Sequence, residues 1–247
     1  MKSIILALAI SSSFPFPGAF PGLPQTTDSS KALPTVEQVL RKYVEALGGS
    51  SAHLKLTTRV EKGEWENATR GIRHPVEIYA KAPNKRVELL DAPENRGATG
   101  RGHDGTTGWS MNMTETGLRY LEGAELAGAQ RESDFYRQIR LDRLYVRLAV
   151  VGREGLGGRE VYVVDATPES GNPEKLYFDV ETGLLSRRDM VYGKTPVQHY
   201  YEDYRNVDGI KLPFVVRSEG PVKVITRLTE IKHNVPIEDA RFKSPSN

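Results

Sequence analysis

Apolar and polar residues alternate along most of the chain after residue 54, and this two-residue period restricts the fold more than any other feature. Successive side chains of a strand point to opposite faces, so each alternating segment can bury one face of a sheet. The apolar positions include Val76, Ile78 and Ala80; Val87 and Leu89; Trp109, Met111 and Met113; Leu176, Phe178 and Val180; and Ile210, Leu212, Phe214 and Val216. The pattern predicts roughly ten strands between Leu54 and Ile231.

Short turns separate the predicted strands and favour antiparallel pairing, because parallel neighbours would need long crossover segments. Asp208-Gly209, between two β-rich runs, is the strongest hairpin signal in the chain. Further turns are expected at Gly157-Gly158, Glu181-Thr182-Gly183 and Glu219-Gly220-Pro221. The chain is therefore expected to be mainly β, with an antiparallel sheet.

Two segments depart from the strand pattern. Thr35 and Gln38 form the sequence of a capping box, which predicts that a helix begins there. Its apolar positions recur with the helical period, and Gly48-Gly49 ends it. Residues 123–145 are rich in helix-forming residues and predict one or two further helices, anchored by Phe135, Tyr136, Ile139 and Leu144.

The first thirty residues are expected to lie outside the folded domain. Lys2 precedes an apolar run over residues 4–10, which is far shorter than the ~20 residues needed to span a bilayer. Pro15, Pro17 and Gly18 then stop any helix. This pattern is typical of a secretory signal peptide followed by a flexible leader, the alternative being a disordered start of a cytoplasmic protein. Residues 31–247 are expected to form a single domain.

Composition narrows the classes of function. The chain has 34 Lys+Arg against 32 Asp+Glu, and a net charge of +2 does not favour nucleic acid or an anionic membrane as partner. It has no cysteine, so neither a disulfide nor a lipid-modified cysteine is expected. If the chain is exported, it is thus expected to be free in the periplasm, as a monomer.

The motifs of catalytic and cofactor sites are weak or missing. Residues 100–105 match G-x-G-x-x-G, but a strand follows them where a dinucleotide site needs a helix, so a loop is the preferred interpretation. The five histidines lack the spacing of metal ligands, and neither G-x-S-x-G nor S-x-x-K occurs. The sequence predicts no enzyme, no cofactor and no metal, although carboxylates paired only by the fold would not be visible in it.

Several motifs occur in an order that resembles a known family. They are Ala-Pro-Asn-Lys-Arg at 82–86, His-Asp-Gly-Thr-Thr-Gly-Trp at 103–109, Tyr-Phe-Asp-Val-Glu-Thr-Gly at 177–183, Asp-Gly-Ile-Lys-Leu-Pro at 208–213 and Asp-Ala-Arg-Phe-Lys-Ser-Pro at 239–245. Over roughly residues 35–245 the chain resembles the LolA-like superfamily of outer-membrane lipoprotein-sorting proteins. The segments around 177 and 208 look like a branch of uncharacterised exported bacterial proteins.

The resemblance implies a curved antiparallel incomplete β-barrel, a half-barrel with an N-terminal helix and a helical lid over its concave side. It also implies a periplasmic carrier that holds a lipid or the acyl chain of a lipoprotein, with envelope proteins as further partners. The candidate cavity residues are Val76, Ile78, Val87, Leu89, Trp109, Met111, Met113 and Phe178 on strands, with Leu126, Phe135 and Ile139 from the lid.

Two alternatives stay open. Each candidate residue could belong to an ordinary core, and the protein could be a structural or interaction module of the envelope with a filled core. Cavity volume distinguishes the two, since a carrier needs about 300 Å³ or more. A third class, an exported hydrolase, would need two or three polar groups converging in a cleft.

Overall fold

Thirteen antiparallel strands form one sheet in the part of the chain that the computed structural model describes, which is residues 32–90, 99–112, 117–192 and 194–245. The strands are β1 (Thr58–Asn67), β2 (Ile72–Lys81), β3 (Lys85–Leu90), β4 (Thr99–His103), β5 (Gly108–Asn112), β6 (Gly117–Tyr120), β7 (Arg147–Leu156), β8 (Arg159–Thr167), β9 (Glu174–Asp179), β10 (Leu185–Tyr192), β11 (Thr195–Val207), β12 (Ile210–Glu219) and β13 (Val224–His233). The predicted leader over residues 1–30 and Met113 lie outside the described residues.

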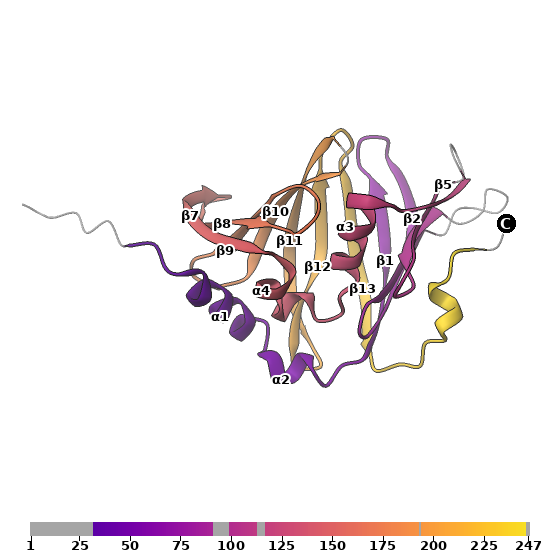
Figure 1. Cartoon of the computed structure of the whole chain (residues 1–247), viewed down its shortest axis with the longest axis horizontal. Helices are drawn as coiled ribbons and strands as arrows, with labels where there is room; N and C mark the ends of the chain where they lie inside the picture. Colours follow the sequence, from indigo (N-terminus) through magenta and orange to yellow (C-terminus); the bar gives the residue numbers. More distant parts are fainter. Residues whose placement is uncertain (1–31, 91–98, 113–116, 193, 246–247) are drawn as a thin grey trace, which may run out of the picture. The chain divides into compact units, whose positions relative to one another are not determined.

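The strand order is β6-β5-β4-β3-β2-β1-β13-β12-β11-β10-β9-β8-β7. The chain therefore makes two meanders, and the first strand pairs with the last, so that β1 and β13 join them in the middle of the sheet (Figure 1). The edge strands are β6 and β7, which are not paired with each other, so the sheet is an open half-barrel. The antiparallel half-barrel expected from the sequence is confirmed.

Two of the predicted hairpin turns are confirmed by their strand pairing and backbone angles. Asp208 and Gly209 join β11 to β12 with φ angles of 52° and 85°. Gly157 and Gly158 join β7 to β8 with φ angles of 58° and 80°. Two consecutive positive φ angles are what a type I′ turn requires, and such a turn matches the twist of the paired strands.

The helices are α1 (Val36–Ala46), α2 (Ser50–His53), α3 (Gly123–Ser133) and α4 (Leu141–Leu144), with 3₁₀ turns η1 (Arg137–Ile139) and η2 (Asp239–Phe242). The capping box is confirmed, since the Thr35 side chain accepts from the Gln38 amide at 3.3 Å and the Gln38 side chain accepts from the Thr35 amide at 2.9 Å. None of the helices among the described residues is long and apolar enough to cross a membrane.

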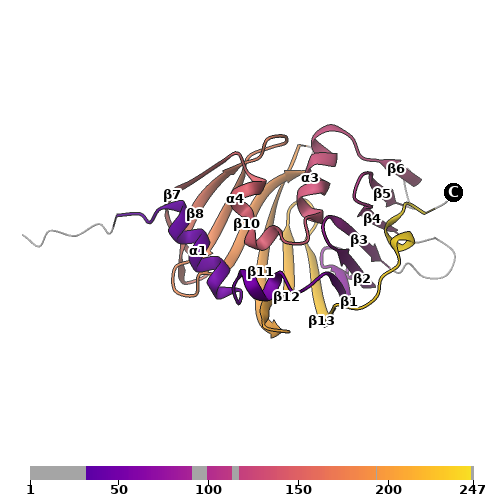
Figure 2. The same cartoon turned by 60° about the horizontal axis from the view of Figure 1, so that its bottom comes forward.

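The helices cover one face of the sheet. From the edge strand β6 the chain crosses this face through α3, η1 and α4 and re-enters the sheet at the opposite edge, β7 (Figure 2). At the β7 end, α1 packs on the same face through Val39 and Tyr43, whose ring meets that of Phe178 edge-on at 5.1 Å. Residues 121–146 thus form the helical lid that was expected.

The C-terminal segment covers the other face. Residues 234–245 run beside β3 and β5 (Figure 2). There Phe242 and Ile237 cluster with Val87 and Trp109. The indole nitrogen of Trp109 donates a hydrogen bond to the Phe242 carbonyl oxygen at 3.0 Å. Both faces of this half of the sheet therefore bury apolar side chains.

Candidate functional site

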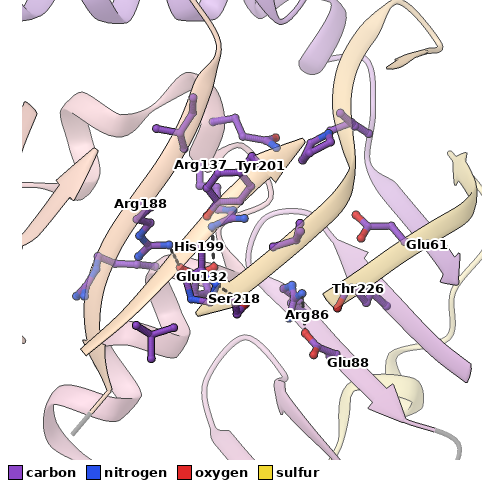
Figure 3. A pocket seen from close by; sticks show the side chains of 18 of the residues that line it. Glu61, Arg86, Glu88, Glu132, Arg137, Arg188, His199, Tyr201, Ser218 and Thr226 are labelled. Carbon is purple, nitrogen blue, oxygen red and sulfur yellow. Dashed lines mark hydrogen bonds and ion pairs between the residues drawn. The ribbon is translucent and has the colours of Figure 1, made fainter. Parts of the chain in front are cut away.

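A cavity of about 580 Å³ lies between the lid and the face of the sheet that the helices cover (Figure 3). Its walls come from strands on both sides of the β1–β13 pair and from α3, η1 and α4. Its aliphatic lining residues are Ile78, Leu141, Leu144, Leu176, Leu185, Val197, Leu212, Val216, Val222, Val224, Leu228 and Ile231. These side chains offer a surface on which a hydrocarbon chain can be buried.

The lining also contains charged residues, which the sequence did not lead us to expect. On β3 and β4, Glu88 accepts from Arg86 at 3.0 Å and from Arg101 at 3.4 Å. Arg101 also donates to the Tyr192 hydroxyl at 3.4 Å. Burial would raise the pKa of Glu88, but the charges of Arg101 and Arg86 outweigh it and hold that pKa at about 2. We call Arg86, Glu88 and Arg101 the Glu88 group.

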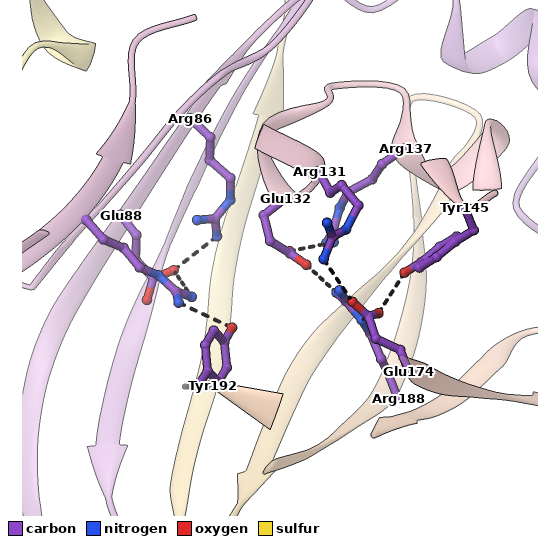
Figure 4. A network of polar contacts seen from close by, with 10 residues as sticks. Arg86, Glu88, Arg131, Glu132, Arg137, Tyr145, Glu174, Arg188 and Tyr192 are labelled. Carbon is purple, nitrogen blue, oxygen red and sulfur yellow. Dashed lines mark hydrogen bonds and ion pairs between the residues drawn. The ribbon is translucent and has the colours of Figure 1, made fainter. Parts of the chain in front are cut away.

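A second charged group joins the lid to β9 and β10 (Figure 4). Its members are Arg131, Glu132, Arg137, Glu174 and Arg188, and we call it the Glu132 group. Arg188 contacts Glu132 and donates to Glu174 at 2.6 Å. Burial would raise the pKa of Glu132, but Arg137 and Arg188 hold it well below its usual range. All five side chains are more than two-thirds buried.

Three further contacts complete the Glu132 group. Arg137 donates to Glu132 at 2.6 Å, and Arg131 reaches Glu174 at 3.4 Å. The Tyr145 hydroxyl donates to Glu174 at 2.7 Å (Figure 4). Each carboxylate is thus shared by two arginines, an arrangement that fixes the lid to the sheet at several points.

A histidine and a serine face the same cavity from neighbouring strands (Figure 3). His199 on β11 lies opposite Ser218 on β12, with 2.7 Å between the Nδ1 and Oγ atoms. Burial, followed by the charge of Arg188, lowers the pKa of His199 to about 4. The imidazole is therefore neutral at pH 7, as expected of a base in a positively charged cavity.

A smaller cavity of about 260 Å³ adjoins the first, between α3 and strands β4, β5 and β10. The two share Arg86, Arg101, Arg131, Glu132 and Tyr192 in their linings. The charged groups therefore stand at the boundary between the two spaces.

Of the sequence-predicted site residues, Ile78 lines the larger cavity. Val76 is fully buried two residues before it on β2. Four of the predicted residues lie on the other face of the sheet, together under the C-terminal segment: Val87, Leu89, Trp109 and Met111. There Leu89 and Trp109 line a groove of about 620 Å³ beside residues 236–245.

The lid residues and Phe178 are placed in the packing around the cavity. Leu126 on α3 lies next to Gly108 on β5. Phe135 is buried in a cluster with Ile210 and Leu212. Ile139 is half-buried in η1, and Phe178 is fully buried against α1. The structure thus does not bring the ten described residues of the predicted set into one lining.

The arginines and glutamates that line the cavity were missed by sequence reasoning. A signal was present in Arg86-Val-Glu88 and Arg59-Val-Glu61, where opposite charges lie two residues apart on a strand. Such residues share one face of the sheet, opposite the apolar residue between them. Among the described residues, no group of His, Cys, Asp or Glu has the arrangement of a metal site.

Comparisons with known proteins give matches in structure only. No protein-family model matches the sequence, and no curated protein matches it. A DUF1329 family protein from Desulfovibrio piger superposes with a TM-score of 0.58 at 14% identity, covering 84% of this chain and 97% of the other. A LolA superfamily protein from Nitrosomonas europaea gives 0.57 at 13% identity, covering 86% and 99%.

A third solved structure is a domain assigned as an outer membrane lipoprotein-sorting protein, from Vibrio parahaemolyticus. It gives a TM-score of 0.55 at 11% identity and covers 82% of this chain and 97% of the other. The protein is therefore of the class of open antiparallel half-barrels whose concave face is covered by helices. Within that class its fold is LolA-like, as the order of the sequence motifs indicated.

Proposed function

We propose that this protein is an exported carrier that holds a lipid, or the acyl chain of a lipoprotein, in the cavity under its lid. The observation that carries the proposal is the cavity of about 580 Å³ between the lid and the sheet. Small-molecule sites span roughly 300–1,000 Å³. A module with a filled core would have no space of this size, so the volume favours a carrier.

The energetics of an apolar chain support the same proposal. Transfer of one methylene group from water to an apolar site contributes about 0.8 kcal/mol, so a chain of ten buried methylenes would gain about 8 kcal/mol before the cost of ordering. The twelve aliphatic residues of the lining are the surface that would receive it. Binding of this kind requires no catalytic group.

The direct test is native mass spectrometry of the protein purified without delipidation, followed by titration with a fluorescent fatty acid. A carrier is expected to retain a ligand of lipid mass or to take up the fluorescent chain at micromolar concentration. Protein that is consistently free of ligand and takes up no chain would contradict the proposal.

A matched pair of variants locates the binding. Val216→Phe places a larger side chain in the cavity, whereas Val215→Phe makes the same change one residue earlier, on the opposite face of β12. We expect Val216→Phe to weaken uptake at least about tenfold, because the added ring occupies space the chain needs. Val215→Phe should bind as the unsubstituted protein does. Equal effects of the two would place the ligand elsewhere.

The Ser218–His199 contact is the observation that favours a second candidate, an exported hydrolase. A general base works best with a pKa near the working pH, and a pKa of about 4 makes His199 a weak base at pH 7. We therefore prefer the carrier. Hydrolysis of a p-nitrophenyl acyl ester that is lost in Ser218→Ala would reverse this preference.

Export is proposed from the sequence pattern of residues 1–30. The mature protein is expected in the periplasm as a monomer. N-terminal sequencing of protein recovered from the periplasmic fraction should begin within or shortly after that segment. Recovery in the cytoplasmic fraction with residues 1–30 intact would count against export.

A further inference from the structure

The boundary between the two cavities is where the charged side chains gather. Arg86, Arg101 and Arg131 belong to the lining of both spaces. The Glu88 group and the Glu132 group both contribute residues to this shared lining, and Figure 4 shows labelled members of each. A ligand that passed from one cavity into the other would come into contact with these guanidinium groups.

Positive charge is in excess at this boundary. The Glu88 group has two arginines and one glutamate, and the Glu132 group has three arginines and two glutamates. The remaining charged residues of the two linings form the balanced pairs Arg59–Glu61 and Arg119–Glu125. Among the described residues, each group therefore keeps one positive charge without a carboxylate of its own.

Several of the donors on these arginines make no hydrogen bond to a residue that the structure describes. Arg101 makes two long contacts of 3.4 Å, and half of its side-chain surface is accessible. A guanidinium has five N–H donors, so at least three make no hydrogen bond within the described part of the chain. The Nε atom of Arg131 is buried and makes no hydrogen bond to any described residue.

An unmatched charge in a cavity with apolar walls is costly unless an opposite charge accompanies it. We infer that the boundary binds the carboxylate or phosphate of an anionic amphiphile, held by Arg101 and Arg131, with its hydrocarbon chain in the larger cavity. The inference rests on the proposed carrier function and names its class of ligand. Arginine suits this role because its planar fork binds carboxylate and phosphate through paired hydrogen bonds.

The test compares ligands that share one chain and differ in the head. Hexadecanoate, hexadecyl phosphate and hexadecanol are titrated calorimetrically into the delipidated whole protein, each delivered from cyclodextrin, with inorganic phosphate as the head alone. Hexadecanoate and hexadecyl phosphate are expected to bind at least about tenfold more tightly than hexadecanol, the difference that one charge-assisted contact provides.

Variants test whether arginines at the boundary cause the preference for an anionic head. Arg101→Gln should reduce the preference for the anionic ligands to about threefold or less, and Arg131→Gln, from the other group, should do the same. Arg101→Lys keeps the charge and should retain part of the preference. Arg227→Gln is the matched control, because Arg227 is similarly exposed and also paired with one glutamate but lies on the opposite face of the sheet.

The outcomes separate the inference from the function on which it rests. Equal affinity for hexadecanoate and hexadecanol would overturn the anionic head and leave the carrier in place. A preference that survives in both glutamine variants would overturn the assignment to Arg101 and Arg131. If no long-chain ligand binds, the carrier function fails, and binding of inorganic phosphate alone would show an oxyanion site that serves no amphiphile.

Discussion

Arg188 on β10 contacts Glu132 on α3, and this ion pair ties the lid to the sheet beneath it. The same guanidinium donates to Glu174 at 2.6 Å, and its side chain is 7% exposed. One buried arginine therefore pairs with two carboxylates that are 42 residues apart in the sequence. The position of the lid depends on this junction as well as on apolar packing.

Replacement of Arg188 should destabilise the protein strongly. Arg188→Met leaves two buried carboxylates short of a partner, and removal of one member of a buried pair costs about 3–5 kcal/mol. Urea unfolding followed by circular dichroism measures the loss. Arg205→Gln, in an exposed pair with Asp203, is the control and should change stability by less than about 1 kcal/mol. A loss of similar size in both variants would contradict the role given to Arg188.

The contribution of Glu88 to stability should depend on pH. Its folded-state pKa of about 2 lies below the ordinary value of 4.5, so its ion pairs stabilise the protein above pH 4.5 and are lost as the pH falls towards 2. The stability difference between the unsubstituted protein and Glu88→Gln should shrink by about 3 kcal/mol over that interval. Urea titrations at several pH values measure it.

Glu45→Gln serves as the control for this pH series, because Glu45 is 70% exposed and lies 4.0 Å from Arg41. Its stability should stay within about 0.5 kcal/mol of the unsubstituted protein at every pH. A difference for Glu88→Gln that is constant with pH would rule out the depressed pKa.

Gly102 is required by the close approach of Trp109. A Cβ atom at position 102 would lie 2.7 Å from the indole ring, so Gly102→Ala should displace the ring and cost about 1–3 kcal/mol. In a Trp65→Phe background the fluorescence of Trp109 should shift to longer wavelength. Gly155→Ala on β7, where a Cβ would meet nothing within 4 Å, should leave stability within about 0.5 kcal/mol. An unshifted spectrum in Gly102→Ala would refute the contact.

Phe242 should anchor the C-terminal segment. It is fully buried beside Trp109, and Phe242→Ala should cost about 3 kcal/mol and loosen residues 234–245. Trypsin should then cleave faster at Arg241 and Lys243, both exposed. Leu33→Ala, at a side chain with 44% exposure, should change neither stability nor cleavage. Unchanged cleavage in Phe242→Ala would mean that other contacts hold the segment.

Local features of the fold could be predicted from the sequence because their physical causes are local. Thr35 and Gln38 cap α1 through atoms three residues apart, and Asp208-Gly209 adopts the backbone angles of a tight hairpin. The two-residue period identified strands correctly, although thirteen are present where roughly ten were expected. The order of motifs indicated the LolA-like half-barrel.

The side of the sheet that faces the cavity could not be predicted. Alternation places Val87 and Leu89 on one face of β3 and Arg86 and Glu88 on the other, but it does not say which face the lid covers. Both faces are covered here, one by the lid and one by the C-terminal segment. The apolar residues of β3 therefore pack under that segment, and the charged ones line the cavity.

The elements, the turns and the antiparallel sheet follow from hydrogen bonds and side-chain periods within short stretches of sequence. The candidate site does not, because Arg86, Arg101, Arg131, Glu132 and Arg188 come from four separate elements. They meet only because β1 pairs with β13 and the lid crosses from one edge of the sheet to the other. This arrangement brings charged side chains that are far apart in the sequence into one cavity. The positive excess at the cavity boundary is the result.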